Sequence, residues 1–515
     1  MHGTWAIVAT LTAGVGCAGQ AGETARAAGQ APAEEVIPSA GPGADLEAFI
    51  GRALELDLAP GMAVAVVRGD DVAFLAGYGW ADVDARRPVT PGTPFYIASS
   101  TKSFTGTAAA ALDVQGRMDL DAPLSRYLPD VTLQAPLSAD SITLRDLLTH
   151  THGLDNGGPI VIRTAYTGDH DPDLLLGLLE AQPPGEQGRS FQYGNLGYNV
   201  ASMAMDAELG ESWKDVLAEE IFRPLGMAST TAYMSRVDRD ARALPYGWEP
   251  DGRWEAKPYT KGDANMHAAG GLVTTAEDLS RWLIANLSEG RIDGTQALPA
   301  AAVREAHRPL ADNDDAWGPF TREGYGLGWH VGTYDGSRQL HHFGGFPGFH
   351  AHVSFMPEEG IGVAVLVNES GMGSALATGV AAYAYDAYRG VADLPARSDA
   401  LLERLAQEGE RSRSAITADR ERRSARPQAL PHPLSAYAGT YENPAFGRIA
   451  WEVRGDRLHA RMGLAESEVE VYDGAQNALR VELTGGGTVA SFDFSGGAER
   501  AAAVTILGVP FTRVE

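Results

Sequence analysis

Strand-like apolar runs stand at both ends of one long stretch of the sequence, and helical patterns fill its middle. Five runs of this kind are bounded by turns: 61–67, 72–76, 339–343, 349–356 and 361–367. From about 101 to 300 the sequence is mainly helical in pattern, with long irregular loops. The simplest fold for this order is one antiparallel sheet, built from both ends of the stretch and packed against helices. We therefore predict an α+β domain over residues 45–395.

The sequence changes character after this domain. Residues 396–433 are charged and arginine-rich, and prolines close the segment, so we predict a charged linker or solvated helix there. From 434 to 515, short β-like runs alternate with glycine-rich turns: 449–453, 457–462, 479–483, 489–494 and 503–507. About eight short strands in roughly 80 residues predict a small β-barrel or sandwich.

The first residues resemble an export signal. Residues 5–15 are a short apolar run, and Cys17 follows it as the only cysteine of the chain. We predict a signal peptide over 1–17, possible lipid attachment at Cys17, and a flexible linker over 18–44. The protein is then expected to be exported, either periplasmic or anchored to the membrane as a lipoprotein. A single cysteine allows no intrachain disulfide and no cysteine-based metal site.

The net charge of the chain limits the classes of partner that it is expected to bind. The 515 residues carry a formal net charge of −26, and the pI is about 4.9. Nucleic acids and anionic membrane surfaces both select basic patches, so neither is an expected partner. We expect a small-molecule or short peptide substrate instead.

Ser99 and Lys102 form a Ser-x-x-Lys pattern where an apolar β-like run meets a helix-like one. Serine is a poor nucleophile unless a base lies within hydrogen-bond reach. Residues three apart share one face of a helix, so Lys102 can lie beside the Ser99 hydroxyl. A serine at a helix start also has free backbone N–H groups nearby, which suit a developing oxyanion. On its own, the pattern fits an ordinary helix start with an exposed lysine better than a catalytic site.

Tyr193-Gly194-Asn195 supplies two further candidate groups. A lysine cation beside a tyrosine favours the phenolate, so we expect Lys102 to lower the pKa of Tyr193. Such a pair can carry a proton from the serine to a leaving group. Asn195 can hydrogen-bond both the lysine and a substrate amide. Taken alone, the segment also fits a polar turn with a core tyrosine.

His342 stands on a predicted strand just before Gly344 and Gly345. Glycines at this place allow a substrate to approach the backbone closely. The backbone N–H of Gly345 is therefore a candidate oxyanion donor, together with that of Ser99.

In this order, the three motifs resemble the active-site motifs of the serine β-lactamase and penicillin-binding protein family, closest to its class C and esterase-like branch. Several flanking segments are similar to family signatures as well: Ile97-Ala98, 143–151, 221–227, 269–279 and 325–329. The resemblance covers about residues 45–390. The tail that opens at Tyr437 resembles the lipocalin-like β domain that is often appended to these hydrolases.

The resemblance implies roles for the matched residues. Ser99 is the nucleophile, and Lys102 and Tyr193 activate it and return the proton to the leaving group. Asn195, His342, Gly344 and Gly345 bind the substrate or its oxyanion, and no metal or organic cofactor is implied. The family's β-lactamases usually carry Lys-Thr-Gly where this chain has His342-Phe343-Gly344. The substitution favours an ester or amide, as in esterases and D-amino-acid peptidases, over the alternative of β-lactams or peptidoglycan.

Other classes of protein remain open at this point. His150/His152 and His350/His352 are two His-x-His pairs that could belong to a metal hydrolase, although acidic ligands at a recognisable spacing are missing. The Gly-x-Ser-x-Gly elbow of α/β-hydrolases is absent. A catalytically silent scaffold protein is the non-enzymatic alternative.

Overall fold

The computed structural model describes residues 41–514. The predicted signal peptide, Cys17 and nearly all of the predicted linker lie outside these residues. The first helix, α1 (Pro42–Leu54), begins three residues before the predicted domain boundary at 45. A proline in the first turn explains the earlier start, because its fixed φ suits a helix and its missing N–H has no partner there.

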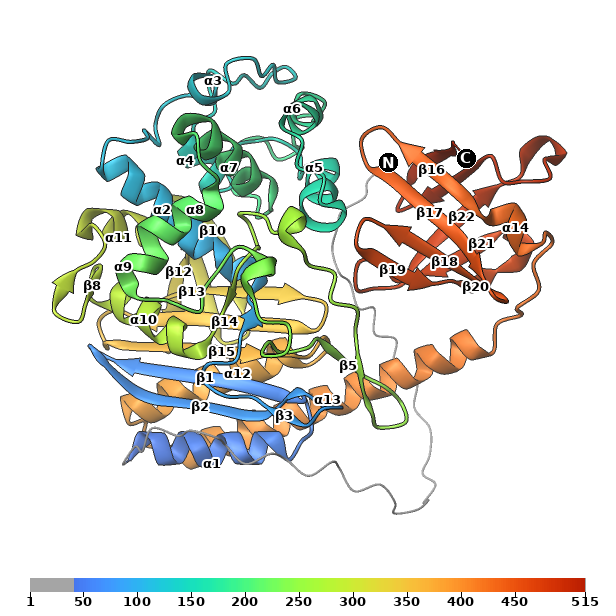
Figure 1. Ribbon diagram of the computed structural model, residues 1–515. Coiled ribbons are helices and arrows are strands. Elements are labelled where there is room, and N and C mark those ends of the chain that lie inside the picture. Colours follow the sequence, from blue (N-terminus) through green and yellow to red (C-terminus); the bar gives the residue numbers. More distant parts are fainter. Residues whose placement is uncertain (1–40, 515) are drawn as a thin grey trace, which may run out of the picture. The chain divides into compact units, whose positions relative to one another are not determined.

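A nine-stranded antiparallel sheet forms the centre of the first domain (Figure 1). Its strand order is β10-β11-β12-β13-β14-β15-β1-β2-β3. The strands are β1 (Gly61–Arg68), β2 (Asp71–Asp82), β3 (Arg87–Pro88), β10 (Ala311–Trp317), β11 (Phe320–Tyr325), β12 (His330–Tyr334), β13 (Ser337–Phe346), β14 (Phe349–Met356) and β15 (Ile361–Val367). Strand β1 pairs with β15 on one side and β2 on the other, so the two ends of the stretch meet at the middle of the sheet. This confirms the predicted fold class.

The sheet is covered on both faces, which explains why β1 is buried along almost its whole length. Met62, Val64 and Val66 pack into one core with α1 and α12 (Gly373–Arg389). The alternate residues Ala63, Ala65 and Val67 pack into the other core. That second core is formed with α2 (Thr101–Val114), α7 (Leu196–Leu209) and α10 (Ala276–Leu287). Successive side chains of a strand point to opposite faces of the sheet, so β1 contributes to both hydrophobic cores.

Shorter elements connect these layers. The short helices are α3 (Leu124–Tyr127), α4 (Leu144–Leu148), α5 (Gly158–Ile162), α6 (Pro172–Glu180), α8 (Trp213–Leu217), α9 (Arg223–Leu225) and α11 (Ala300–Ala306). Three two-stranded ribbons are formed by β4 (Phe95–Tyr96) with β7 (Val273–Thr274), β5 (Tyr246–Trp248) with β6 (Trp254–Ala256), and β8 (Arg291–Ile292) with β9 (Thr295–Gln296).

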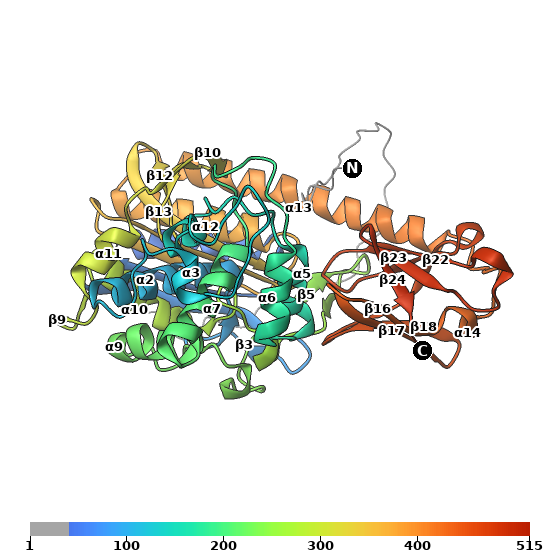
Figure 2. The same cartoon turned by 90° about the horizontal axis from the view of Figure 1, so that it is seen from above.

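The segment predicted as a charged linker is mostly one continuous helix, α13 (Leu394–Ser424) (Figure 2). Its first half carries Leu401, Leu402 and Leu405, which are buried in the same core as α12. A single apolar edge is therefore enough to fix a helix whose other faces are charged. None of the described helices is both long and apolar enough to cross a membrane.

The C-terminal residues form a nearly closed barrel, coloured red in Figure 1. A short helix, α14 (Leu434–Tyr437), leads into it. The strands follow the order β19-β18-β17-β16-β24-β23-β22-β21-β20. They are β16 (Gly439–Asn443), β17 (Gly447–Arg454), β18 (Arg457–Met462), β19 (Ala465–Glu468), β20 (Glu470–Asp473), β21 (Ala478–Val481), β22 (Thr488–Asp493), β23 (Ala503–Ile506) and β24 (Val509–Arg513). This confirms the predicted barrel domain.

Candidate active site

Ser99 lies at a strained junction between a strand and a helix. The chain leaves β4, makes one 3₁₀ turn over Ala98–Ser100 and continues into α2. Ala98 has φ of +43°, a conformation that costs energy for any residue with a side chain. Ser99 itself is half-buried, whereas Ser100 and Thr101 are buried. The turn thus leaves the serine as the reachable hydroxyl of this segment.

Lys102 is completely buried beside Ser99. Its Nζ lies 3.1 Å from Ser99 Oγ, 2.8 Å from Asn195 Oδ1 and 2.8 Å from the carbonyl oxygen of Ala269. Burial lowers the pKa of Lys102 well below its ordinary value. A neutral amine has two N–H donors and one lone pair. These three contacts fit that state, with N–H groups donated to Asn195 and Ala269 and the lone pair facing the Ser99 hydroxyl.

Tyr193 packs its ring against this amine. Lys102 Nζ lies 4.9 Å from the ring centre. Burial raises the pKa of Tyr193 to about 12, although the Ser99 hydroxyl and Arg322 act in the opposite direction. The expectation that Lys102 lowers this pKa into a phenolate range is therefore wrong. Both groups are buried together, and burial favours the neutral form of each.

Asn195 connects the second motif to the first. It is the residue before α7, and its side-chain oxygen accepts the hydrogen bond from Lys102. A Cβ on the preceding Gly194 would lie 2.3 Å from Asn156 Oδ1, so a larger residue there would displace the Asn156 side chain. The structure thus brings Asn195 to the place predicted for it.

His342 is fully buried, and both of its ring nitrogens are engaged within the protein. Nδ1 lies 2.8 Å from the carbonyl oxygen of Phe343, so Nδ1 carries the proton. Nε2 then accepts from the Tyr325 hydroxyl at 3.3 Å. Burial and the neighbouring Lys102 lower the pKa of His342 well below its ordinary value. His342, which was predicted to bind substrate, is therefore a buried neutral group whose two ring nitrogens contact other protein atoms.

Gly344 and Gly345 differ sharply in their surroundings. A Cβ on Gly344 would lie 1.9 Å from the carbonyl oxygen of Ile97 and 3.2 Å from Ser99 N. Gly345 is exposed, and the nearest atoms to its Cβ position, in the His350 ring, are 3.6 Å away. Strand β13 therefore packs directly on the turn that carries the nucleophile. The predicted pairing of the Ser99 and Gly345 N–H groups requires this contact.

A cluster of buried rings surrounds Tyr193, and the sequence did not reveal it. We call it the active-site cluster; it consists of His150, Tyr193, Tyr198, Tyr325, His330 and His342. His150 lies 4.8 Å from the rings of both Tyr193 and Tyr325, and His330 stacks on Tyr193 at 5.7 Å. The only sequence signal for these histidines was their presence in short segments around the motifs.

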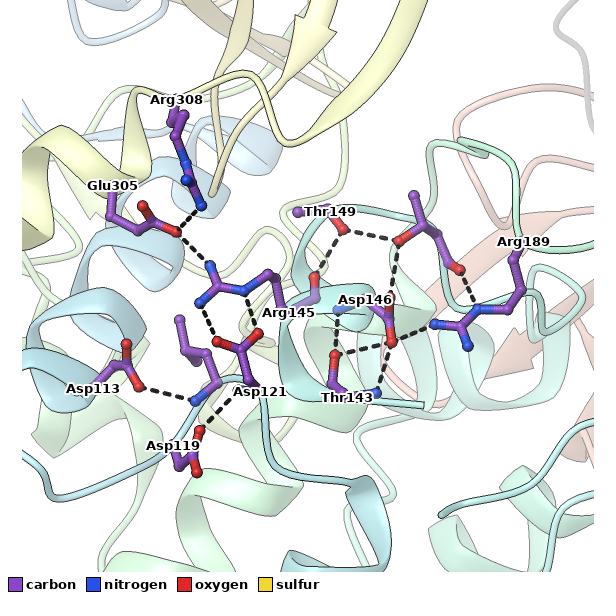
Figure 3. A network of polar contacts seen from close by, with 12 residues as sticks. Asp113, Asp119, Asp121, Thr143, Arg145, Asp146, Thr149, Arg189, Glu305 and Arg308 are labelled. Atoms are coloured by element: carbon purple, nitrogen blue, oxygen red, sulfur yellow. Dashed lines mark hydrogen bonds and ion pairs between the residues drawn. The ribbon is translucent and has the colours of Figure 1, made fainter. Parts of the chain in front are cut away.

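Helix α4 holds His150 in the cluster through a polar network (Figure 3). Thr143 and Asp146 form a capping box at its start. Arg145 donates to both carboxylate oxygens of Asp121 and to Glu305, which ties α4 to α11. His150 follows the helix with φ of +62°. The network thus fixes the end of α4 next to this strained residue, whose ring packs on Tyr193.

The His-x-His pairs do not converge on a common centre. His152 Nδ1 accepts from the Leu154 N–H, and His350 Nδ1 lies 2.9 Å from the Glu369 carbonyl oxygen. His352 Nε2 lies 2.7 Å from Ser354 Oγ. Within residues 41–514, no three His, Cys, Asp or Glu side chains are grouped so that they could hold a metal ion.

Comparisons with known proteins agree with this geometry. The family model described as Beta-lactamase matches residues 47–386. A protein named unguisins hydrolase ungD' from Aspergillus campestris is 27% identical over 423 residues, which cover 78% of this chain and 76% of that protein.

Two solved structures share the fold. The octameric penicillin-binding protein homologue from Pyrococcus abyssi has a TM-score of 0.58 at 22% identity and covers 91% of this chain and 98% of its own. A D-amino acid amidase from Ochrobactrum anthropi SV3, solved with L-phenylalanine amide, has a TM-score of 0.55 at 24% identity. It covers 68% of this chain and 97% of its own.

Proposed function

The chain belongs to the Beta-lactamase family, whose relatives are hydrolases, and on that footing we propose that it is a serine hydrolase that forms an acyl-enzyme on Ser99. The substrates we propose are amides and esters without a carboxylate next to the scissile bond, with amides and peptides of D-amino acids as the first class to test.

The contact between Lys102 and Ser99 carries this proposal. The amine lies 3.1 Å from the hydroxyl, is fully buried, and has no carboxylate among its hydrogen-bond partners. Desolvation therefore acts without an opposing negative charge and keeps the amine ready to accept a proton. A buried lysine in this state is a general base for the adjacent serine.

The proposed reaction moves one proton through three groups. Lys102 takes the proton of Ser99 as Oγ attacks the carbonyl carbon, and the backbone N–H groups of Ser99 and Gly345 bind the oxyanion. Tyr193 then gives its proton to the leaving group as the bond to the carbonyl carbon breaks, and Lys102 returns a proton to Tyr193. Water, activated by the same groups, hydrolyses the acyl-enzyme and regenerates Ser99.

The neutral state of His342 supports the choice of substrate. A cation at this position would attract a substrate carboxylate, and His342 offers neither a charge nor a free nitrogen. Substrates without a carboxylate next to the scissile bond fit such a site better. The D-amino acid amidase acts on amides by its name, and the similarity to unguisins hydrolase adds a second hydrolase to the comparison.

A labelling and turnover experiment tests the proposal. We expect a fluorophosphonate probe to label the wild-type protein on Ser99 and to leave Ser99→Ala unlabelled. We expect hydrolysis of D-amino-acid amides or short p-nitrophenyl esters, lost in Ser99→Ala and unaffected by EDTA. Fast turnover of a chromogenic cephalosporin with no amidase or esterase activity would shift the substrate class to β-lactams. A probe-inert protein without turnover would argue for a scaffold.

We also propose that the protein is exported and that Cys17 is its lipid attachment site. The support is the short apolar run before the cysteine. Expression of the full chain with labelled palmitate tests it: the wild type should incorporate label into the membrane fraction, and Cys17→Ala should not. If the wild-type protein is found unlabelled in the soluble periplasm, the proposed export stands and the proposed lipid attachment is wrong.

A further inference from the structure

Arg322 is a buried cation next to the active-site cluster that the reaction above does not use. It lies on β11, and only 6% of the residue is exposed. Its guanidinium is 4.8 Å from the centre of the Phe343 ring and 5.2 Å from that of Trp317. Phe343 stands between His342 and Gly344, so this cation lies directly behind the third motif.

The charge of Arg322 is only weakly compensated. Its Nε–H donates to His341 Nε2 at 3.1 Å, and burial lowers the pKa of that histidine, which keeps it neutral. Nη1 reaches Asp315 at 3.4 Å, but the side chain of Asp315 is 62% exposed, and water screens it. Nη2 is buried and has no hydrogen-bond partner within the described residues. A cation buried in this way raises the electrostatic potential around it.

Two layers of rings separate this guanidinium from Tyr193: His341 and Phe343 contact the guanidinium, and His330 lies between them and Tyr193. His330 stacks on Tyr193 at 5.7 Å on one side, and lies 5.3 Å from His341 and 6.2 Å from Phe343 on the other. Burial, with Arg322 as the second cause, lowers the pKa of His330 far below its usual range, so the layer between them is neutral. A neutral, water-excluding layer transmits a charge with little screening.

We propose that Arg322 is a positioning residue for the reaction, whose buried charge stabilises the tyrosinate that forms when Tyr193 gives its proton to the leaving group. This inference rests on the proposed function. His342 on β13 is neutral, so the positive charge near Tyr193 is provided by Arg322 on β11. Arg322 acts through the field at Tyr193 and touches neither the substrate nor Ser99.

The other groups that face Tyr193 carry no permanent positive charge, and Lys102 is positive only while it holds the proton of Ser99. They come from every element packed around the ring: Ser99 and Lys102 from the start of α2, His150 after α4, Tyr198 on α7, Tyr325 on β11, His330 on β12 and His342 on β13. The histidines are held neutral, and Lys102 is neutral in the resting state. Arg322 is the group of this neighbourhood that stays charged throughout the reaction.

A leaving-group series separates this role from simple packing. Protonation of the leaving group speeds bond cleavage for an alkoxide or an amine. It has little effect on the rate for p-nitrophenolate, which leaves as a stable anion. With one acyl group and both kinds of leaving group, we expect Arg322→Met to lower kcat/KM roughly tenfold for the alkyl ester or amide. For the p-nitrophenyl ester we expect less than a twofold change. Arg322→Lys should restore most of the loss.

Two further variants keep the test decisive. Asp315→Asn removes the exposed counter-charge, and we expect it to raise kcat/KM for the poor leaving group by about twofold, opposite in sign to Arg322→Met. Arg389→Met is the matched control, since Arg389 is also a largely buried arginine but pairs with Asp335 and Glu359 away from the site. It should affect both substrates equally. If Arg322→Met does not fold, Arg322→Lys and Asp315→Asn still give the comparison.

The outcomes identify which proposal fails. The role of Arg322 would be wrong if Arg322→Met lowered kcat/KM equally for both leaving groups. It would also be wrong if Asp315→Asn did not raise kcat/KM for the poor leaving group. Either result would leave the proposed serine hydrolase activity unchanged. Absence of any Ser99-dependent turnover in the wild type would overturn the proposed function itself.

Discussion

The active-site cluster and the barrel core are both dense groups of buried rings, but they treat their polar atoms differently. In the barrel, the Tyr441 hydroxyl donates to the Tyr437 carbonyl oxygen at 2.9 Å and accepts from Arg513 at 2.7 Å. The Tyr437 hydroxyl donates to Asn477 at 2.6 Å. In the active-site cluster, His330 Nε2 and both nitrogens of His150 have no partner within the described residues.

The difference separates a region built for stability from one built for chemistry. A buried polar group that is hydrogen-bonded costs little, whereas an unpaired one destabilises the fold by about 1–3 kcal/mol. The barrel core satisfies the hydroxyls of Tyr437 and Tyr441, although the indole nitrogen of Trp451 is buried there without a partner within the described residues. Burial in the active-site cluster lowers the pKa of Lys102 and raises that of Tyr193, so it favours a neutral amine that water would protonate.

Removal of the base is expected to have the largest effect. Lys102→Met should lower kcat/KM by at least about 1,000-fold, because Lys102 is the neutral base that contacts the Ser99 hydroxyl. The measurement is steady-state hydrolysis of an ester, with circular dichroism to verify the fold. If folded Lys102→Met protein still hydrolysed the ester at nearly the wild-type rate, Lys102 would not be the base. The active-site cluster would then not differ chemically from the barrel core.

Loss of the tyrosine hydroxyl comes next. Tyr193→Phe keeps the ring that packs on Lys102 and removes the acid, so acylation should slow at least about 100-fold. Single-turnover kinetics with an amide substrate measure this step directly. An equally slow p-nitrophenyl ester would contradict the role of Tyr193 in leaving-group protonation.

A pair of glycine variants tests how tightly β13 packs on the nucleophile turn. Gly344→Ala places a methyl group against the Ile97 carbonyl and should cost about 1–3 kcal/mol of stability, with at least about tenfold lower activity. Gly345→Ala finds no atom within 3.4 Å and should leave stability nearly unchanged. Urea unfolding of both proteins is the measurement. Equal stabilities would show that this contact does not constrain the site.

The barrel should respond in stability alone. Tyr441→Phe removes a hydroxyl with two hydrogen-bond partners and leaves the Tyr437 carbonyl oxygen unpaired, which should cost about 2 kcal/mol. We expect kcat/KM to stay within twofold of the wild type. An unchanged unfolding midpoint would show that the barrel does not depend on its bonded tyrosines.

The buried lysine also predicts a pH dependence of stability. The pKa of Lys102 is lowered on folding, so the unfolded chain binds more protons below its ordinary value of 10.5. Unfolding free energy therefore rises with pH between the folded and unfolded pKa values, by up to about 1.4 kcal/mol per pH unit. The stability of the wild type relative to Lys102→Met should therefore rise with pH below 10.5, as measured by urea unfolding at a series of pH values. A flat difference would mean that Lys102 is charged in the fold.

Much of the fold was readable from the sequence because its central strands are long apolar runs. Strands β1, β2, β13, β14 and β15 were all predicted. Strands β10 to β12 were not, and β10 shows why: Asp312, Asp314 and Asp315 make it a polar strand at the sheet edge. Edge strands carry charge to avoid pairing with other chains, which removes the hydrophobic signal that prediction needs.

The sequence alone determined which residue types the site contains and their order, because Ser99, Lys102, Tyr193 and Asn195 lie in short motifs with local geometry. Only the tertiary structure decided their protonation. Lys102 meets the Ala269 carbonyl from 167 residues away, and Tyr193 is enclosed by rings from the loop after α4 and from β11, β12 and β13. A pKa depends on all charges and all water within several ångströms of a group, and that surrounding exists only after distant segments have packed together.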